Sequence, residues 1–395
     1  MNKRVGIITR YYKSINYGGN LQAYALCQFL NKNGFEAEQI CFSEKRKHKN
    51  LKKSFLDRLI LKIKRILKNP VRELFIAPNE KRLCKKYNVW ERRKNAFYKF
   101  NTHSIPHSNE VFYTDSIFNC VEDYDVFITG SDIVWNLKKY DPPYFLNFVP
   151  DSKIKIAYAA SLGMDSLTEE QRNFLKQHLQ GYLQISVREN DAVELLKEIT
   201  SVKPIQAADP TLLLSKSDWD SICSNRLISR RYVFCYFLGN NKKERVLAKK
   251  YAAKRGLQVV SIQPSVGTDP ILLSDFQFGD IRLYDVTPED FISLIKYAEC
   301  VFTDSFHAVV FSSIYEREFF VFNRNKTNSL NTRIKSIVEL FGTEERFCCG
   351  KERESLHYLL NLNPLDYKKI NIRVDELKEI SKKFLLNGVQ GDINA

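Results

Sequence analysis

The residues with the clearest chemical potential form an Asp-Ser-Phe-His sequence at positions 304–307. It follows Cys300–Thr303, a short apolar run that predicts a buried strand, and it precedes a helix that we expect to begin near Ser305. Ligands of open α/β sheets bind beyond the carboxyl ends of the strands, where helix N-termini also offer N–H groups to anions. We therefore expect His307 at the mouth of a ligand site. In the alternative interpretation, Ser305 only caps the helix and His307 is structural.

Polar residues also follow the end of a strand predicted at 125–130. Ser131 and Asp132 come directly after Gly130, and Trp135 follows them. We interpret this group as a contact surface for substrate hydroxyls; the alternative is that Ser131 or Asp132 caps a short helix.

Two further segments have a possible role in binding anions. Arg188 ends a strand predicted at 184–188, and its alternative role is a surface ion pair with Glu189 or Asp191. The loop Asn16–Asn20 contains two adjacent glycines before a helix predicted at 21–33, which is a weak indication of an anion-binding turn.

Strands and helices alternate along most of the chain, which favours parallel sheets. We predict an α/β protein with two Rossmann-like domains that face each other across a cleft. The predicted domains are 1–215, expected on the acceptor side, and 216–345, expected on the donor side. A tail at 346–395 follows, and its helix, near 374–386, is expected to pack back across the junction. Further strands are expected at 5–9, 37–42, 155–160, near 204–205, and at 232–237, 258–262 and 318–322.

A strongly basic segment at 45–105 interrupts this alternation and is interpreted as a helical insertion in the first domain. Residues 45–99 contain 20 Lys and Arg against four acidic residues, a local excess of +16 in a chain whose total is +15. Apolar residues recur at helical spacing between positions 55 and 67, so the segment predicts a basic amphipathic helix. Such a helix suits anionic lipid, nucleic acid or a solvated face of its own domain. We rank nucleic acid last because no binding motif accompanies the charge.

The remaining composition places the protein among folded chains of 395 residues, long enough for two domains. No apolar run reaches the roughly 18 residues that span a bilayer, and the N-terminus leads directly into a strand. Nine cysteines without zinc-ligand spacing indicate reduced core residues of a cytosolic protein, with no metal site.

Taken together, several ordered segments resemble the polysaccharide pyruvyl transferase family over nearly residues 3–345. The matching segments are Asn16–Leu26, Ile128–Asn136, Ser186–Glu189, Ala208–Leu213, Thr303–His307 and Asn331–Ile334.

The resemblance implies a GT-B-like fold and transfer of a pyruvyl group from phosphoenolpyruvate to two hydroxyls of one sugar, which forms a cyclic ketal. Phosphoenolpyruvate is then a co-substrate and no cofactor is expected. By the family pattern Arg188 and His307 map to donor-binding positions, and His307 is the expected acid because imidazole titrates in the physiological range. Asp132 or Asp304 is the candidate base.

One position departs from the family pattern. Many members have Arg two residues before the histidine, where this chain has Ser305. Our hypothesis is that Arg333 or Arg324 supplies that positive charge to the donor from a neighbouring loop. The residues assigned to acceptor binding are Asn16, Tyr17, Asn20, Ser131 and Trp135.

The acceptor is expected to be a glycan, either free or linked to polyprenyl diphosphate, and the basic insertion is expected to hold the enzyme at the anionic inner face of the plasma membrane. Two alternatives remain at this point: a GT-B glycosyltransferase that uses a nucleotide sugar, and a non-catalytic membrane-associated factor of glycan assembly.

Overall fold

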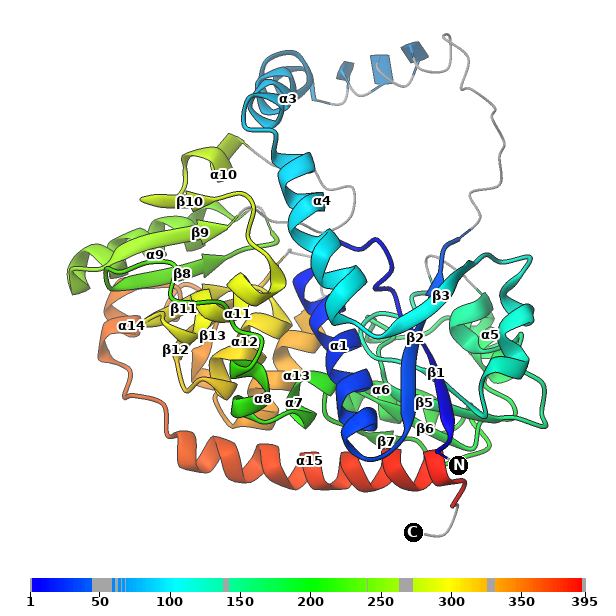
Figure 1. Ribbon diagram of the computed structural model, residues 1–395. Coiled ribbons are helices and arrows are strands. Elements are labelled where there is room, and N and C mark those ends of the chain that lie inside the picture. The colour runs from blue at the N-terminus through cyan, green and yellow to red at the C-terminus, as the bar shows by residue number, and fades with distance from the viewer. Residues whose placement is uncertain are drawn as a thin grey trace.

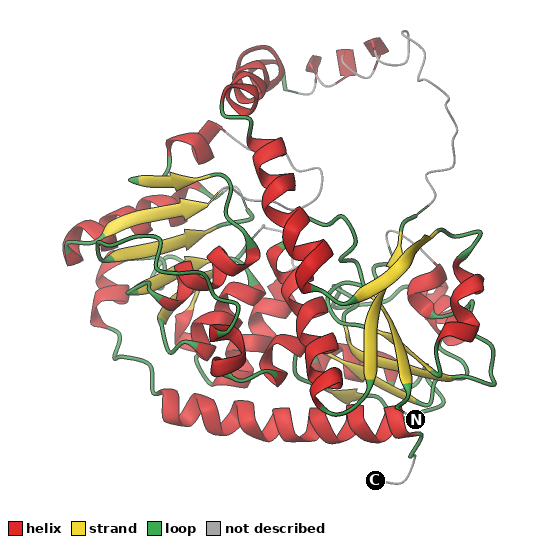
Figure 2. Ribbon diagram, in the orientation of Figure 1, coloured by secondary structure: helices red, strands yellow, loops and turns green. Residues whose placement is uncertain are grey.

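The fold was obtained as a computed structural model, which describes residues 2–44, 59–60, 63–64, 66–67, 69–137, 142–239, 241–262, 273–324 and 331–392. Most of the predicted amphipathic helix at 55–68 lies outside these residues. The described residues form two parallel β-sheets flanked by helices, as Figure 2 shows.

The first sheet has seven strands in the order β3-β2-β1-β4-β5-β6-β7. These strands are β1 (Arg4–Ile8), β2 (Glu36–Phe42), β3 (His107–Phe112), β4 (Val126–Thr129), β5 (Ile154–Ala160), β6 (Gln184–Val187) and β7 (Ile205–Gln206). The helices between and after them are α1 (Tyr17–Lys32), α5 (Glu169–His178), α6 (Asn190–Leu196) and α7 (Pro210–Leu213). Strands β1, β4 and β5 are almost wholly buried, which explains their continuous apolar sequences.

The second sheet has six strands in the order β10-β9-β8-β11-β12-β13. Its strands are β8 (Tyr232–Tyr236), β9 (Gln258–Ile262), β10 (Ile281–Leu283), β11 (Cys300–Thr303), β12 (Glu318–Phe322) and β13 (Phe347–Cys348). The helices around it are α8 (Lys216–Asp220), α9 (Lys242–Arg255), α10 (Leu273–Gln277), α11 (Pro288–Lys296), α12 (Phe306–Ile314), α13 (Asn331–Phe341) and α14 (Leu356–Asn361).

The basic insertion is helical in its described part and reaches the second sheet's domain. It contains a π-helical turn at Arg72–Ile76, α3 (Ala77–Lys86), α4 (Val89–Lys99) and a second π-helical turn at Phe100–Ser104. Tyr87 stacks on Tyr284 with ring centroids 5.2 Å apart, and Arg92 forms an ion pair of 2.8 Å with Asp285. The insertion therefore contacts both domains.

A long C-terminal helix, α15 (Tyr367–Gln390), runs beneath both sheets in Figure 1. The hydroxyl of Tyr367 donates to the Arg317 carbonyl in the second domain. At the other end, Lys3 donates to the Val389 carbonyl at 3.0 Å. The helix is longer than the predicted segment near 374–386 and connects the two domains along one side.

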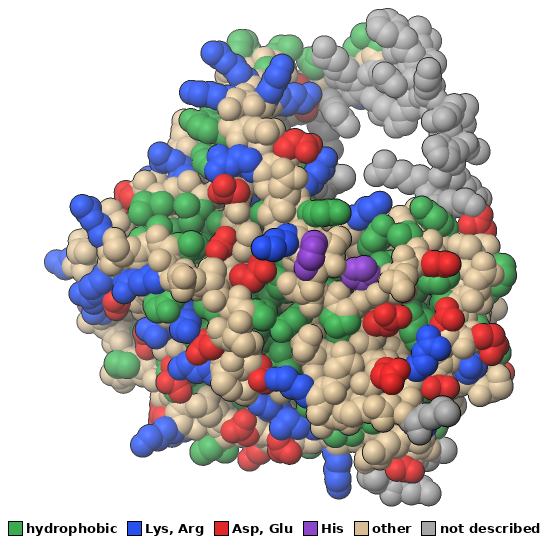
Figure 3. All heavy atoms as spheres, in the orientation of Figure 1, with side chains coloured by type: hydrophobic (Ala, Val, Ile, Leu, Met, Phe, Trp, Pro, Cys, Tyr) green, Lys and Arg blue, Asp and Glu red, His purple; other side chains and the backbone are tan. Residues whose placement is uncertain are grey.

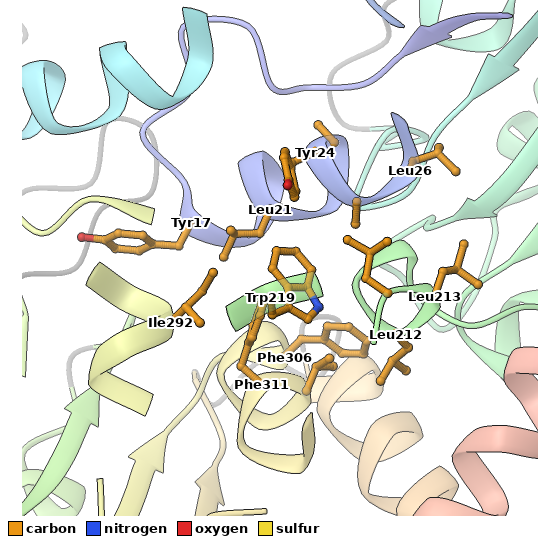
Figure 4. Close-up of a cluster of buried hydrophobic side chains, with 14 of the residues drawn as sticks. Tyr17, Leu21, Tyr24, Leu26, Leu212, Leu213, Trp219, Ile292, Phe306 and Phe311 are labelled. Carbon is orange, nitrogen blue, oxygen red and sulfur yellow. The ribbon is translucent and has the colours of Figure 1, made fainter. Parts of the chain in front are cut away.

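An apolar junction joins the domains on the inner side. Figure 4 shows side chains from α1, α7, α8, α11 and α12 converging there. Tyr17 stacks on Phe291 with centroids 4.6 Å apart, and Trp219 packs edge-on against Phe311 at 4.8 Å. Aromatic pairs of this kind add about 0.5–1.5 kcal/mol each beyond their area burial, so the junction stabilises one relative position of the domains.

The described residues were compared with the predictions on membrane spans and cysteines. None of their helices combines the length and apolar character of a membrane span. All nine cysteines lie within the described ranges as free thiols.

Candidate active site

His307 lies in the first turn of α12, where the second domain meets the first. Ser305 is the N-cap residue of α12 but its side chain makes no capping hydrogen bond, and its N–H donates to Thr303 Oγ1 at 3.0 Å. The imidazole is 6% exposed, and its Nε2 lies 3.4 Å from Asp209 Oδ2. On the Nδ1 side it lies so close to Gly18 that a Cβ there would be 1.9 Å from Nδ1. His307 is thus held between two elements of the first domain.

Asp209 lies at the centre of the site and contacts residues of both domains. The sequence did not predict a role for it. Its Oδ1 accepts hydrogen bonds from the N–H and hydroxyl of Thr211, at 3.0 and 2.7 Å, which caps α7. Its Oδ2 accepts from Arg188 Nη1 at 3.0 Å and from Ser131 Oγ at 3.2 Å. Burial alone would raise the pKa of Asp209, but the positive charges of His307 and Arg188 hold that pKa well below its usual range. Asp209 is therefore an ionised, fully buried anchor.

Arg188 follows the carboxyl end of β6, as the sequence predicted, and the alternative ion pair with Glu189 does form, but it is buried instead of lying on the surface. Its side chain is 2% exposed, and its Nε donates to Glu189 Oε1 at 3.1 Å. The guanidinium lies 4.2 Å from the ring centroid of Phe306, in a cation–π contact across the domains. Burial lowers the pKa of Arg188, and the carboxylates of Glu189 and Asp209 outweigh that effect and raise it.

Asp132 is the most accessible carboxylate of this group, with a side chain 16% exposed. It has a left-handed backbone, with φ at +63°, and forms a parallel bridge with Ala160 beyond the ends of β4 and β5. Its Oδ1 lies 3.7 Å from Arg188 Nη2 and 3.6 Å from Arg333 Nη1. Burial would raise the pKa of Asp132, but Arg188, His307 and Arg333 together lower it. Its position and charge suit contact with an incoming ligand.

Arg333 and Arg324 come from the second domain and add positive charge to the same place. Arg333, in α13, has a side chain 8% exposed, and burial together with the charges of Arg188 and Arg324 lowers its pKa to about 10. Arg324 Nη2 lies 3.5 Å from the Asp304 carbonyl oxygen. The carboxylates of Asp132 and Glu189 act in the opposite direction on Arg333 and offset part of the repulsion among these cations.

Asp304 has a supporting position in the second domain. Its two carboxylate oxygens accept hydrogen bonds from the N–H groups of Leu238 and Gly239, both at 2.7 Å. These contacts hold the loop after β8 next to the start of α12. Burial raises the pKa of Asp304.

Two buried donors of the cluster, Arg188 Nη2 and Arg333 Nε, lack a hydrogen-bond acceptor among the described residues, and His307 Nε2 has Asp209 Oδ2 as its partner at 3.4 Å. Buried polar groups are nearly always hydrogen-bonded in folded proteins, and an unmatched one costs about 1–3 kcal/mol. The arrangement is therefore that of a site prepared for an anion with several acceptor oxygens.

Two aromatic residues expected to bind the acceptor lie instead in the protein core. Trp135 is fully buried, stacks on Phe145, and donates from Nε1 to the Tyr144 carbonyl at 3.1 Å. Tyr17 is 1% exposed, and its hydroxyl donates to the Val286 carbonyl at 2.9 Å. Neither ring has a surface left for a sugar, so both expectations are corrected.

The polar residues expected on the acceptor side are mostly structural as well. Asn20 is fully buried and donates to the carbonyls of Ser14 and Asn16. Asn16 caps α1, since its side chain accepts from the Gly19 N–H at 3.4 Å. Ser131 is fully buried and supports Asp209. Short polar side chains before a helix satisfy backbone groups as readily as they bind ligands, which explains the error.

Comparison with known families assigns the chain. The family model for polysaccharide pyruvyl transferase matches residues 16–326. This chain belongs to the polysaccharide pyruvyl transferase family. As a member it is a transferase, and the matched residues begin at the cap of α1 and include Asp132, Arg188, Asp209 and His307.

Among solved structures, a UDP-N-acetylglucosamine 2-epimerase from Rickettsia bellii has a TM-score of 0.53 and 10% identity, and the alignment covers 100% of this chain and 97% of that one. The UDP-GlcNAc 2-epimerase of Neisseria meningitidis has a TM-score of 0.45 at 12% identity, covering 98% and 100%. Acinetobacter baumannii MurG has a TM-score of 0.45 at 10% identity, covering 98% and 99%. At such identities the likeness concerns the fold, which is the predicted GT-B-like arrangement. Among curated proteins, none matches this sequence.

Proposed function

We propose that this transferase moves the pyruvyl group of phosphoenolpyruvate onto two hydroxyls of one sugar, in a surface polysaccharide or its lipid-linked precursor, and forms a cyclic ketal. The observation that carries the proposal is a buried group of cations beside His307 in which Arg188 Nη2 and Arg333 Nε lack acceptors among the described residues. Phosphoenolpyruvate offers a carboxylate and a phosphate, and guanidinium groups bind both through paired hydrogen bonds. The N-terminus of α12 adds a favourable dipole.

His307 is the proposed acid. Its proton passes to the methylene carbon of phosphoenolpyruvate, and C2 then accepts the oxygen of the first sugar hydroxyl. The bond between C2 and the bridging oxygen breaks next, phosphate leaves with that oxygen, and the second hydroxyl oxygen bonds to C2. Of the two hydroxyl protons, one restores His307 and the other leaves on phosphate. Asp132 orients the attacking hydroxyls, since its ionised carboxylate accepts hydrogen bonds from them.

Arg333 and Arg324 take the place of the family arginine that Ser305 replaces. Arg333 Nη1 lies 3.6 Å from Asp132 Oδ1, and the charge of Arg324 lowers the pKa of Arg333. Both arginines therefore belong to the same electrostatic group. Either guanidinium can receive the phosphate or the carboxylate of the donor, whereas the Ser305 hydroxyl cannot offer a bidentate cation.

Calorimetry with phosphoenolpyruvate tests this proposal directly. Saturable binding is expected for the parent chain, and Arg333→Gln or Arg324→Gln should weaken it at least tenfold, because a charge-assisted hydrogen bond contributes about 1.5–3 kcal/mol. Arg353→Gln, at an exposed arginine of the same domain, is the matched control and should bind normally. If both site variants bind like the parent, these arginines do not replace the family residue. Binding only to nucleotide sugars would move the assignment to glycosyl transfer.

The fate of the bridging oxygen tests the reaction itself. With phosphoenolpyruvate labelled with oxygen-18 between C2 and phosphorus, ketal formation must release labelled phosphate, because both ketal oxygens come from the acceptor. Label retained in the organic product would refute the mechanism.

We also propose that the insertion attaches the enzyme to the inner face of the plasma membrane. Figure 3 shows Lys and Arg side chains gathered together with hydrophobic ones around the top left, over α3. Exposed apolar side chains in this region include Leu67, Val71, Leu74 and Phe75. Basic and apolar groups together favour anionic lipid surfaces. Flotation with liposomes containing phosphatidylglycerol at low salt should recover the protein, and phosphatidylcholine liposomes should not.

A further inference from the structure

A cavity of about 510 Å³ lies in the first domain, between the loop at residues 11–15 and the base of the insertion. Its other walls come from β2, the end of α4 and the residues around β3. None of its lining residues belongs to the anion-binding cluster. The volume falls within the range of about 300–1,000 Å³ that is typical of small-molecule sites.

The deepest part of this cavity is apolar. Tyr11 and Phe97 are each 1% exposed, and Cys41 is 3% exposed. The Tyr11 hydroxyl and the Cys41 sulfur lie 3.1 Å apart and hydrogen-bond to each other, so these polar atoms are matched within the wall. Tyr98, at 66% exposure, is an aromatic residue at the rim.

The polar side chains of the lining mostly bond to the protein itself. Thr102 Oγ1 donates to the Tyr98 carbonyl at 2.9 Å, and Asn101 Nδ2 donates to the Ser14 carbonyl at 3.3 Å, which leaves Asn101 Oδ1 as one unmatched acceptor of the lining. Ser108 Oγ donates to a backbone carbonyl at 2.8 Å and accepts from a backbone N–H at 2.9 Å. A sugar needs partners for each hydroxyl that it brings out of water. This lining therefore favours an apolar chain over a sugar ring.

The rim carries positive charge. Lys13 and Lys94 both line the cavity and are exposed, and Lys94 lies 3.2 Å from Glu91. Lys13 has a left-handed backbone, with φ at +55°, and its Nζ lies 5.0 Å from the ring centroid of Tyr12. Cations at the mouth of an apolar cavity suit a chain that ends in a phosphate.

The cavity wall and the candidate site are linked by one short stretch of chain. The loop at 11–15 forms one wall and continues directly into Asn16, the cap of α1, and then into Gly18, which contacts His307. One wall of the cavity and the residue that contacts His307 therefore belong to the same short segment of chain.

We propose that this cavity binds an apolar chain ending in phosphate, and so holds the lipid end of a lipid-linked sugar acceptor. The inference rests on the proposed function for the identity of the acceptor, but the cavity can be tested without it. Two sources share this chemistry, a polyprenyl carrier and a membrane phospholipid, and their chains differ enough to be separated by short soluble probes.

The experiment is calorimetry of the full chain with farnesyl phosphate and, separately, with dihexanoylphosphatidylglycerol, both below their micelle concentrations. Val111 lines the cavity from β3, so Val111→Trp should fill it and weaken binding at least tenfold. Glu110→Trp, at the exposed neighbouring position outside the lining, is the matched control and should bind like the parent. Tyr98→Asp tests the rim with a side chain that is already exposed, in case Val111→Trp fails to fold.

Binding of farnesyl phosphate alone supports a polyprenyl carrier, and binding of both probes supports a general site for anionic lipid chains. If neither probe binds saturably, the proposal is overturned. It is also overturned if Val111→Trp and Tyr98→Asp both leave the binding unchanged. Phosphoenolpyruvate titrations of the same samples separate the two hypotheses. Donor binding without lipid binding refutes only the cavity, and lipid binding without donor binding refutes only the proposed reaction.

Discussion

Replacing Gly18 by alanine is the sharpest test of how the two domains build this site. A Cβ on Gly18 would lie 1.9 Å from Nδ1 and 2.5 Å from Cε1 of His307. Ordinary contacts begin near 3.4 Å, so the imidazole or the start of α1 must move by about 1.5 Å. Displacements of about 1 Å at a reacting centre can cost about a hundredfold in rate. We therefore expect kcat for ketal formation to fall about a hundredfold.

The same substitution should leave folding intact, because Gly18 lies within α1 and alanine is the better helix former by about 1 kcal/mol. Gly19→Ala is the matched control, since its Cβ would meet nothing closer than 3.7 Å. Gly19→Ala gives the same increase in helix stability but leaves His307 in place. Comparing the two variants isolates the position of the imidazole from helix stability.

Histidine-selective carbon-13 NMR gives a readout that does not depend on knowing the acceptor. The chain has six histidines, so six Cε1 resonances are expected. Gly18→Ala should shift the His307 resonance, identified by its loss in His307→Asn, and Gly19→Ala should leave it unchanged. A Gly18→Ala protein with the parent His307 resonance and the parent kcat would refute the close approach and the role built on it.

Two further predictions concern stability. Burial raises the pKa of Glu244 to about 9, from an unfolded value near 4.3, so the folded state keeps a proton and loses up to about 1.4 kcal/mol of stability for each pH unit between these values. Glu244→Gln should therefore melt higher than the parent at pH 8 and equally near pH 4 in calorimetric scans, while exposed Glu352→Gln should show no such difference. Ser381→Ala removes the acceptor for the buried Ala208 N–H, at 2.8 Å, and should lower the free energy of unfolding in urea by about 1–3 kcal/mol. Lys383→Ala, at an exposed position of the same helix, should leave that free energy almost unchanged. Equal losses in the two variants would contradict this role of α15.

Central strands were predictable from sequence, and among the edge strands only β7 was, near 204–205. The predicted strands at 300–303 and 318–322 coincide with β11 and β12, because both are short apolar runs buried on both faces. The edge strands β3 and β10 and the two-residue strand β13 were missed, since half-exposed or very short strands lack a continuous apolar pattern. Helix α1 begins four residues before the predicted start at Leu21, because the Asn16 cap allows both glycines into its first turn.

The site was predictable in part for a related reason. The structure brings His307, Asp132, Arg188 and Arg333 together from both domains, and each lies just after a strand or in the first turn of a helix. Asp209 was not predicted as a site residue because helix capping alone explains an Asp-Pro-Thr sequence. Only the folded chain shows that its second oxygen serves the cluster. Sequence cannot reveal such a double role, since capping uses one carboxylate oxygen and leaves the other unassigned.

The correction at Tyr17 explains how the site stays assembled. Tyr17 lies directly before Gly18, so the ring that packs on Phe291 also fixes the backbone against which His307 lies. Arg188 over Phe306 provides a second contact across the same junction, one residue from His307 on the other side. Each domain thus contributes an aromatic contact adjacent in sequence to the close approach between Gly18 and the imidazole. The apolar junction, together with the ion pair between His307 and Asp209, therefore helps to fix the distance on which the proposed proton transfer by His307 depends.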